Sequence, residues 1–128
     1  MLDHVGFAVS DFARSKAFYE QALAPLGYSV FREVTPGETG GGARVGFWAN
    51  GKPDFWIGTG TALKGRLHVA FVAKDRATVD AFYHAALKVG GTDNGAPGMR
   101  PHYHPNYYGA FVLDPDGHNV EAVCRAPA

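Results

Sequence analysis

The sequence predicts an α+β fold made of two tandem βαβββ modules, and an internal repeat is the first observation that predicts it. Sliding the chain by 64 positions places Asp3–Gly27 over Leu67–Gly91. The eleven identical pairs are His4/His68, Val5/Val69, Phe7/Phe71, Asp11/Asp75, Ala13/Ala77, Ala17/Ala81, Phe18/Phe82, Tyr19/Tyr83, Ala22/Ala86, Leu23/Leu87 and Gly27/Gly91. Self-similarity at a fixed offset indicates a duplicated supersecondary unit. The chain therefore divides into a first module of about 1–62 and a second of about 63–128.

The second observation is that each copy begins with a strand and continues into a helix. Leu2–Val9 alternates bulky and small residues with the period of two that is typical of a strand. Asp11 then provides a helix N-cap, and the helix runs as far as Gly27. The second copy has the same order, with a strand at Arg66–Ala73 and a cap at Asp75.

Three further strands are predicted after each helix. They are Tyr28–Val34, Ala43–Ala49 and Pro53–Gly58 in the first module, and Met99–Tyr103, Tyr107–Leu113 and His118–Cys124 in the second. The glycine-rich Pro36–Gly42 and the turns at Asn50–Gly51 and Asp114–Gly117 separate strands from one another. Each set of strands has only one helix to cover it, so we expect the two modules to form a single domain.

The composition narrows the range of partners. Twelve basic and twelve acidic residues give a net charge of zero, which argues against nucleic acid and anionic membranes and leaves homodimerisation open. The single cysteine, Cys124, excludes an internal disulfide and favours a cytoplasmic location. We expect no secretory leader, because no charged-then-apolar segment precedes Asp3, and no apolar run approaches the ~18 residues of a membrane span. A small-molecule ligand is the partner that remains.

Strand alternation places three potential metal ligands beside small residues. His4 shares a strand face with Gly6 and Ala8, and His68 shares a face with Ala70, which leaves room above each imidazole. Glu121 lies within an apolar strand and needs a partner if it is buried. Two neutral histidines and one carboxylate form the facial triad of Fe(II) enzymes, and the same set also suits Zn, Ni, Mn or Co.

The paired modules, the two histidines and the tail LDPDGHNVEAV (Leu113–Val123) together resemble the vicinal oxygen chelate superfamily. This group includes glyoxalase I, extradiol dioxygenases, fosfomycin resistance enzymes and bleomycin-binding proteins, and the resemblance covers essentially the whole chain. It implies one half-open, cupped sheet, with a divalent metal inside on His4, His68 and Glu121. It also implies that a small member of this kind dimerises.

One departure from the family pattern concerns a fourth metal ligand. Glyoxalase I has such a ligand on the last strand of its first module, which is here Lys52–Gly58. The aligned position holds either Phe55 or Ile57, neither of which binds a metal, and Asp54 points to the other face. The predicted site therefore has three protein ligands, a pattern that suits dioxygenases and equally suits Lewis-acid catalysis.

A second unusual stretch is Met99–Tyr108, which is rich in histidine and tyrosine and is interrupted by two prolines. The predicted catalytic residues outside the metal triad are His102, His104 and Tyr108, with a histidine moving a proton. The predicted substrate-binding residues are Trp48, Phe55, Trp56, Arg100 and Tyr107. The alternatives are that the histidines lie in a solvated loop, that Arg100 is a surface residue and that the tryptophans belong to the core.

Two functions are consistent with these residues. The first is a small metal-dependent lyase or dioxygenase-like enzyme that chelates vicinal oxygens of an organic substrate and stabilises an oxyanionic state. The second is a metal-free module that sequesters an aromatic or planar compound in the same cup. The retained ligand types favour the enzyme, whereas the aromatic lining and the missing fourth ligand favour the binding module.

Overall fold

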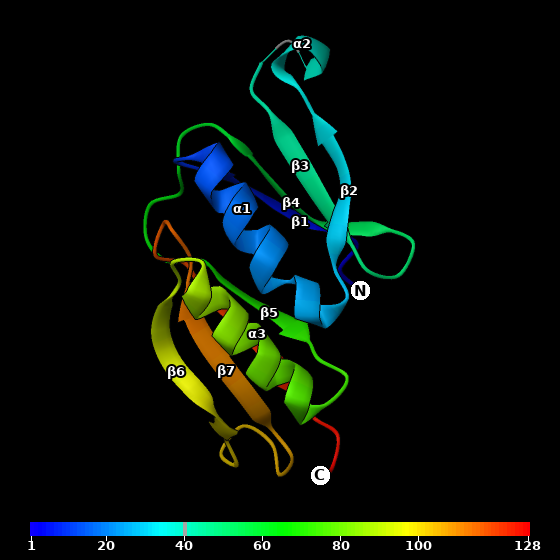
Figure 1. Cartoon of the computed structure of the whole chain (residues 1–128), viewed down its shortest axis with the longest axis vertical. Helices are drawn as coiled ribbons and strands as arrows, with labels where there is room; N and C mark the ends of the chain where they lie inside the picture. The colour runs from blue at the N-terminus through cyan, green and yellow to red at the C-terminus, as the bar shows by residue number, and fades with distance from the viewer. Residues whose placement is uncertain (40) are drawn as a thin grey trace.

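The computed structural model describes residues 1–39 and 41–128 and contains the two predicted modules (Figure 1). The first comprises β1 (Val5–Val9), α1 (Phe12–Ala22), η1 (Ala24–Leu26), β2 (Ser29–Val34), α2 (Pro36–Thr39), β3 (Arg44–Trp48) and β4 (Pro53–Thr59). The second comprises β5 (His68–Val72), α3 (Arg76–Lys88), β6 (Thr92–Met99), β7 (Tyr108–Leu113) and β8 (Asn119–Cys124). The prediction of an α+β fold with two βαβββ modules is confirmed.

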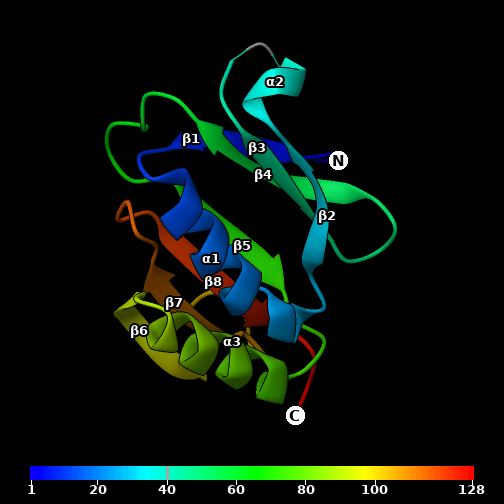
Figure 2. The same ribbon diagram turned by 45° about the horizontal axis from the view of Figure 1, so that its top comes forward.

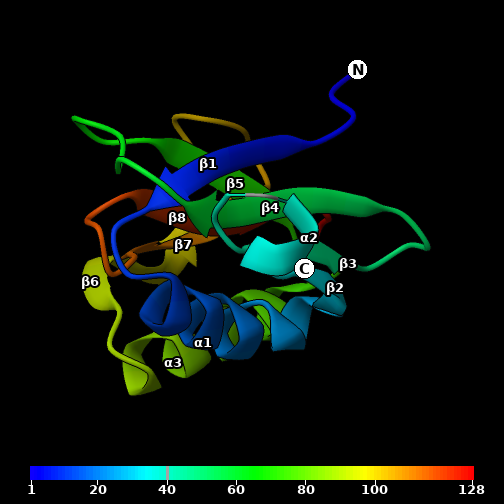
Figure 3. The same cartoon turned by 90° about the horizontal axis from the view of Figure 1, so that it is seen from above.

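Each module forms its own four-stranded mixed sheet. The strand orders are β1-β4-β3-β2 and β5-β8-β7-β6, so the first strand of each module pairs in parallel with the last. All other pairs are antiparallel. Helices α1 and α3 contact one another and lie on the same side of the two sheets, as Figures 2 and 3 show. Among the described residues, no helix covers the opposite face of either sheet.

Both main helices begin at the aspartates that the sequence indicated. Asp11 accepts a hydrogen bond from the backbone N–H of Arg14, and Asp75 accepts one from that of Thr78. These side chains satisfy N–H groups that have no partner within the helix. The equivalent caps at equivalent repeat positions explain why the two modules place their helices in the same way.

The core lies between the helix layer and the two sheets. Phe55 on β4 contacts Phe71 on β5 with ring centroids 5.2 Å apart, and it also contacts Tyr19 of α1 at 4.9 Å. Val9 is buried beside them, as expected for the bulky face of β1. One apolar cluster therefore runs through both modules.

The turn between β7 and β8 joins the modules through polar contacts, one buried and one exposed. Tyr19 donates a hydrogen bond to Asp114 at 2.5 Å, and the backbone N–H of Ser10 donates to Asp116 at 3.0 Å. His118 is also buried, and its Nδ1 accepts a hydrogen bond from the Leu67 backbone. The DPDGH segment thus ties the second sheet to the first module.

One predicted strand lies in the wrong place. Met99–Tyr103 is a turn apart from its first residues, and the edge strand is β6, a segment interpreted as a loop. Its register shifts around Gly95, which has a φ of 148° that other residues rarely adopt. An edge strand with bulges tolerates glycine and proline, and these residues are the reason why the sequence indicated a loop here.

The glycine-rich Pro36–Gly42 segment does separate two strands, β2 and β3. It begins with the single turn α2, which the sequence did not predict, and Gly40 lies outside the described residues. None of the helices in the described part of the chain combines the length and apolar character needed to cross a bilayer.

Candidate functional site

His68 and Glu121 come together on the open face of the second sheet. His68 begins β5 and Glu121 lies on the neighbouring strand β8, so that Nε2 of the imidazole is 3.2 Å from Oε1 of the carboxylate. Two ligands bound at about 2.0–2.2 Å to one ion, roughly at right or tetrahedral angles, are about 3.0–3.5 Å apart. The observed separation therefore fits two adjacent ligands of a metal.

The hydrogen bond at the other ring nitrogen strengthens this interpretation. His68 Nδ1 lies 3.2 Å from the backbone oxygen of Asn119, which can only accept a hydrogen bond. This contact favours the tautomer in which Nδ1 donates and Nε2 faces Glu121 as an acceptor. Nε2 and the carboxylate oxygen are then both electron-pair donors, as two ligands of one cation must be.

Tyr107 supports the carboxylate from the other side. Its hydroxyl donates a hydrogen bond to Oε2 of Glu121, whose side chain is only 2% exposed. Burial, reinforced by the hydrogen bond to the carboxylate, raises the pKa of the Tyr107 hydroxyl well above its ordinary value. The hydroxyl is consequently a proton donor at neutral pH, and it leaves Oε1 facing His68.

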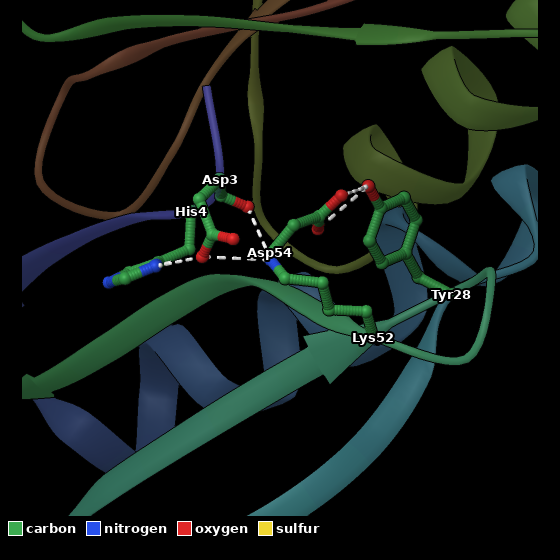
Figure 4. A network of polar contacts seen from close by, with 5 residues as sticks. All are labelled: Asp3, His4, Tyr28, Lys52 and Asp54. Carbon is green, nitrogen blue, oxygen red and sulfur yellow. Dashed lines mark hydrogen bonds and ion pairs between the residues drawn. The ribbon is translucent and has the colours of Figure 1, made fainter. Parts of the chain in front are cut away.

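His4 lies apart from this pair, at the start of β1 in the first sheet. Its Nδ1 is 2.6 Å from Asp3, which also pairs with Lys52 at 2.9 Å (Figure 4). These two hydrogen bonds lower the pKa of the Asp3 carboxyl, with the contact to His4 as the larger cause. The Asp3 carboxylate holds Nδ1 of His4, so Nε2 is the nitrogen that is available to a ligand.

The three predicted metal ligands therefore separate into a pair and a single residue. Within residues 1–39 and 41–128 no group of three His, Cys, Asp or Glu side chains converges to hold a metal. His4 has a side-chain exposure of 59% and His68 of 50%, so both imidazoles are accessible. Each sheet contributes part of the predicted donor set from its open face.

Within the Met99–Tyr108 stretch, residues 100–107 form the loop between β6 and β7, and this loop reaches the pair through tyrosine rings. The His102 ring contacts Tyr103 at 4.2 Å, and Tyr103 contacts Tyr107 at 5.1 Å. His104 instead accepts a hydrogen bond from the backbone of Asn106, which shapes the loop. His102 is thus the histidine that the loop connects to Glu121.

Three predicted site residues lie away from this pair. Tyr108 donates a hydrogen bond to Asp80 of α3, because the next residue along a strand points to the opposite face from Tyr107. Phe55 belongs to the core that joins the modules. Arg100 lies over the ring of Phe111 and donates to the backbone oxygen of Ala96. Their predicted roles in catalysis or substrate binding gain no support from this placement.

A hollow on the open face of the first sheet contains His4, Trp56 and a residue that the sequence interpretation missed, Arg44. The hollow has a volume of about 510 Å³. Trp48 lies nearby, its ring 4.7 Å from that of Phe31. The sequence did contain a signal for Arg44. Within Ala43–Ala49, the arginine shares a strand face with a glycine and a tryptophan.

A larger cavity of about 630 Å³ lies on the side of Tyr28 and Asp54. Figure 4 shows the imidazole of His4 pointing away from this pair. The Tyr28 hydroxyl donates to the Asp54 carboxylate at 3.0 Å, and burial raises its pKa. This cavity contains none of the predicted metal ligands, so the smaller hollow is the relevant one.

Known proteins share both the sequence pattern and the fold. The family model of the Glyoxalase/Bleomycin resistance protein/Dioxygenase superfamily matches residues 1–122. A glyoxalase/bleomycin resistance protein from Albidiferax ferrireducens is 30% identical, with a TM-score of 0.77 and coverage of 98% of this chain and 99% of that chain. No curated protein sequence matches the chain.

Two fosfomycin resistance proteins are similar in fold. FosX from Mesorhizobium loti is 23% identical over 97% of this chain and 91% of its own, with a TM-score of 0.65. FosX from Listeria monocytogenes, whose structure contains Mn(II) and sulfate, is 18% identical over 97% and 91%, with a TM-score of 0.69. The family match over residues 1–122 and the relative that is 30% identical establish that the chain belongs to the Glyoxalase/Bleomycin resistance protein/Dioxygenase superfamily.

Proposed function

We propose that this chain is a metal-dependent enzyme of the glyoxalase/dioxygenase type that acts on a small organic substrate with vicinal oxygens. The observation that carries the proposal is that Nε2 of His68 and the buried carboxylate of Glu121 face each other across 3.2 Å. That spacing suits two adjacent ligands of a divalent ion, and the donor types suit Zn, Ni, Mn or Fe(II). When bound, such an ion supplies Lewis-acid polarisation of the substrate oxygens.

A second copy of the chain completes the donor set in this proposal. His4 and the His68–Glu121 pair lie on the open faces of different sheets, and no third ligand joins them among the described residues. A two-fold dimer that opposes the first sheet of each copy to the second sheet of the other makes two equivalent sites. Each site then has His4 from one copy and the pair from its mate.

The remaining side chains have distinct roles in this site. Tyr107 orients Glu121 through its hydroxyl, and the Asn119 carbonyl fixes the ring orientation and tautomer of His68. His102 is the candidate for moving a proton to or from the substrate, because its loop contacts the tyrosines beside Glu121. The substrate enters from the open face, where His68 is half exposed.

A metal-free binding module is the second candidate function. The hollow beside Trp56 favours it, since an aromatic surface of this kind holds a planar compound without a metal. In that case a shared proton, instead of a cation, joins His68 and Glu121. A cytoplasmic location, and a ligand that is a small molecule and neither nucleic acid nor membrane, are part of both proposals.

Metal stoichiometry distinguishes the two functions. After dialysis against Zn, Ni, Mn or Fe(II) under anaerobic conditions, purified protein should hold about one ion per chain. The ion should leave with a chelator. His68→Ala and Glu121→Gln should each abolish binding, because each removes one of the paired donors. Elemental analysis of dialysed protein measures the content directly.

His84→Ala is the matched control, because His84 lies on α3, on the helix side of the sheet, where its ring contacts that of Tyr83. It should leave the metal content unchanged. Wild-type protein that stays metal-free with all four ions would overturn the enzyme proposal in favour of the binding module.

A further inference from the structure

We infer that the hollow on the open face of the first sheet binds the carboxylate of a planar, aromatic or conjugated compound, with Arg44 as the anion-binding residue and Trp56 as the stacking surface. This inference deepens the proposed function, on which it rests for the identity of the site, by naming the class of substrate. It begins from the glycines that shape the hollow.

The absence of a side chain at Gly46 gives the hollow its flat floor. Gly46 is paired with Trp56 across β3 and β4, and a Cβ at Gly46 would lie 2.8 Å from three atoms of the indole. The indole therefore lies over the backbone of the neighbouring strand. Gly6, on the other side, would bring a Cβ within 3.3 Å of Trp56 Cβ, so the strands on both sides of Trp56 place a glycine beside it.

Arg44 supplies the charge in this hollow. Its aliphatic stem lies against Gly58, where a Cβ would be 3.2 Å from Arg44 Cγ. Its guanidinium makes no ion pair within the described residues, whereas Arg32 on the adjacent strand is paired with Glu38 at 2.8 Å. Arginine presents a planar set of donors that matches a carboxylate, so an unpaired arginine next to an indole suits a planar anion.

His4 lines the same hollow as Arg44 and Trp56. A compound whose ring stacks on Trp56 and whose carboxylate meets Arg44 can therefore direct further oxygens toward His4, where the proposed function needs them. The volume of about 510 Å³ is within the range of small-molecule sites, roughly 300–1,000 Å³. A hollow of this size accommodates one or two fused rings. In the proposed dimer, the facing sheet of the second copy would form its remaining wall.

Binding can be tested by NMR with three probes, namely 2-naphthoate, 2-naphthamide and cyclohexanecarboxylate. The chain contains two tryptophans, so the indole N–H signals of Trp48 and Trp56 are assigned from a Trp48→Phe variant. 2-Naphthoate should shift the Trp56 signal and bind about tenfold or more tightly than the other two. The amide lacks the charge, and the cyclohexane ring cannot stack.

Arg44→Gln should weaken 2-naphthoate binding about tenfold, with little effect on the amide. Arg32→Gln removes a neighbouring arginine from the same sheet and should leave binding unchanged. The dispersion of the NMR spectrum shows whether each variant is folded, and Arg44→Lys provides a second test that preserves the charge and should recover part of the affinity.

All titrations contain a chelator, so that they report on Arg44 and Trp56 independently of any metal. A protein that fails to bind metal but selects 2-naphthoate would overturn the proposed enzyme and retain this inference. Equal affinity for the three probes, a shift confined to Trp48, or unchanged binding by Arg44→Gln would overturn the inference while leaving the metal site intact.

Discussion

At the scale of single residues, the contacts of Glu121 define the candidate site. Glu121 is a buried carboxylate with two distinct partners, Tyr107 at one oxygen and His68 at the other. Gly109 makes this arrangement possible, because a Cβ there would lie 3.2 Å from Oε2 and 3.1 Å from the Tyr107 ring. A buried carboxylate without donors is costly, so Tyr107 both stabilises Glu121 and fixes its direction.

Removing the Tyr107 hydroxyl should therefore weaken metal binding without removing a ligand. Tyr107→Phe leaves Oε2 without its donor and lets the carboxylate rotate, which should lower the affinity about 10–100-fold. Tyr108→Phe is the matched control, since Tyr108 is the next residue and bonds Asp80 on the helix side. Competition with a chromophoric chelator measures both affinities. Equal losses in the two variants would contradict the orienting role of Tyr107.

Helix α1 and the β7–β8 turn depend on each other at the scale of elements. Tyr19 projects from α1 into the core and donates to Asp114, which also accepts from the backbone N–H groups of Asp116 and His118. Helix α1 of the first module thereby fixes the β7–β8 turn of the second module. This turn determines where β8 begins. The strand that contains Glu121 is positioned by this contact.

Tyr19→Phe should lower the free energy of unfolding at neutral pH by about 1–3 kcal/mol, because a buried carboxylate loses a donor. Burial first, and then the charge of Asp114, raises the pKa of the Tyr19 hydroxyl in the folded protein. A raised pKa contributes stability that is present below the unfolded value of about 10 and is lost as the pH rises further. The wild type should thus lose stability above pH 10 more steeply than the variant.

The control for this measurement is Tyr83→Phe, at the equivalent repeat position of the second module. Tyr83 donates to Asp93 near the surface instead of to a buried turn, so its loss should destabilise the protein much less. Urea titrations at neutral pH and above pH 10 give all the required values. A similar decrease in the free energy of unfolding for both variants would show that the buried hydrogen bond from Tyr19 to Asp114 contributes no more than the exposed one from Tyr83.

At the scale of the whole molecule, local patterns predicted much of the fold and only part of the site. The repeat, the aspartate caps and the alternation of β1 are local signals, and each is confirmed in the structure. Strand β6 could not be predicted, because bulges and an edge position remove the usual alternation. The choice between Tyr107 and Tyr108 depends on register, which neighbouring strands decide.

The separation of His4 from His68 could not be predicted either. The repeat indicates equivalent positions in two modules, but the relative placement of the modules results from packing between α1 and α3. Arg44 was missed for a related reason, since its importance appears only when Trp56 and His4 line the same hollow. Contacts between residues on different elements cannot be predicted from local sequence patterns, because they depend on how the elements pack.

A dimer in which each site takes residues from both copies has a distinctive consequence. His4→Ala and His68→Ala should each bind no metal alone, and they should complement one another when mixed and allowed to exchange subunits. A mixed dimer has one site with neither histidine and one site with both. Random exchange makes about half of the dimers mixed, so the mixture should regain about one quarter of the wild-type metal content.

Subunit exchange is started by dilution in mild denaturant followed by refolding, and sedimentation measures the dimer. A mixture of His4→Ala with itself, treated identically, should regain nothing. If both single variants bind no metal and their mixture stays empty although dimers have exchanged, the ligands come together within one chain.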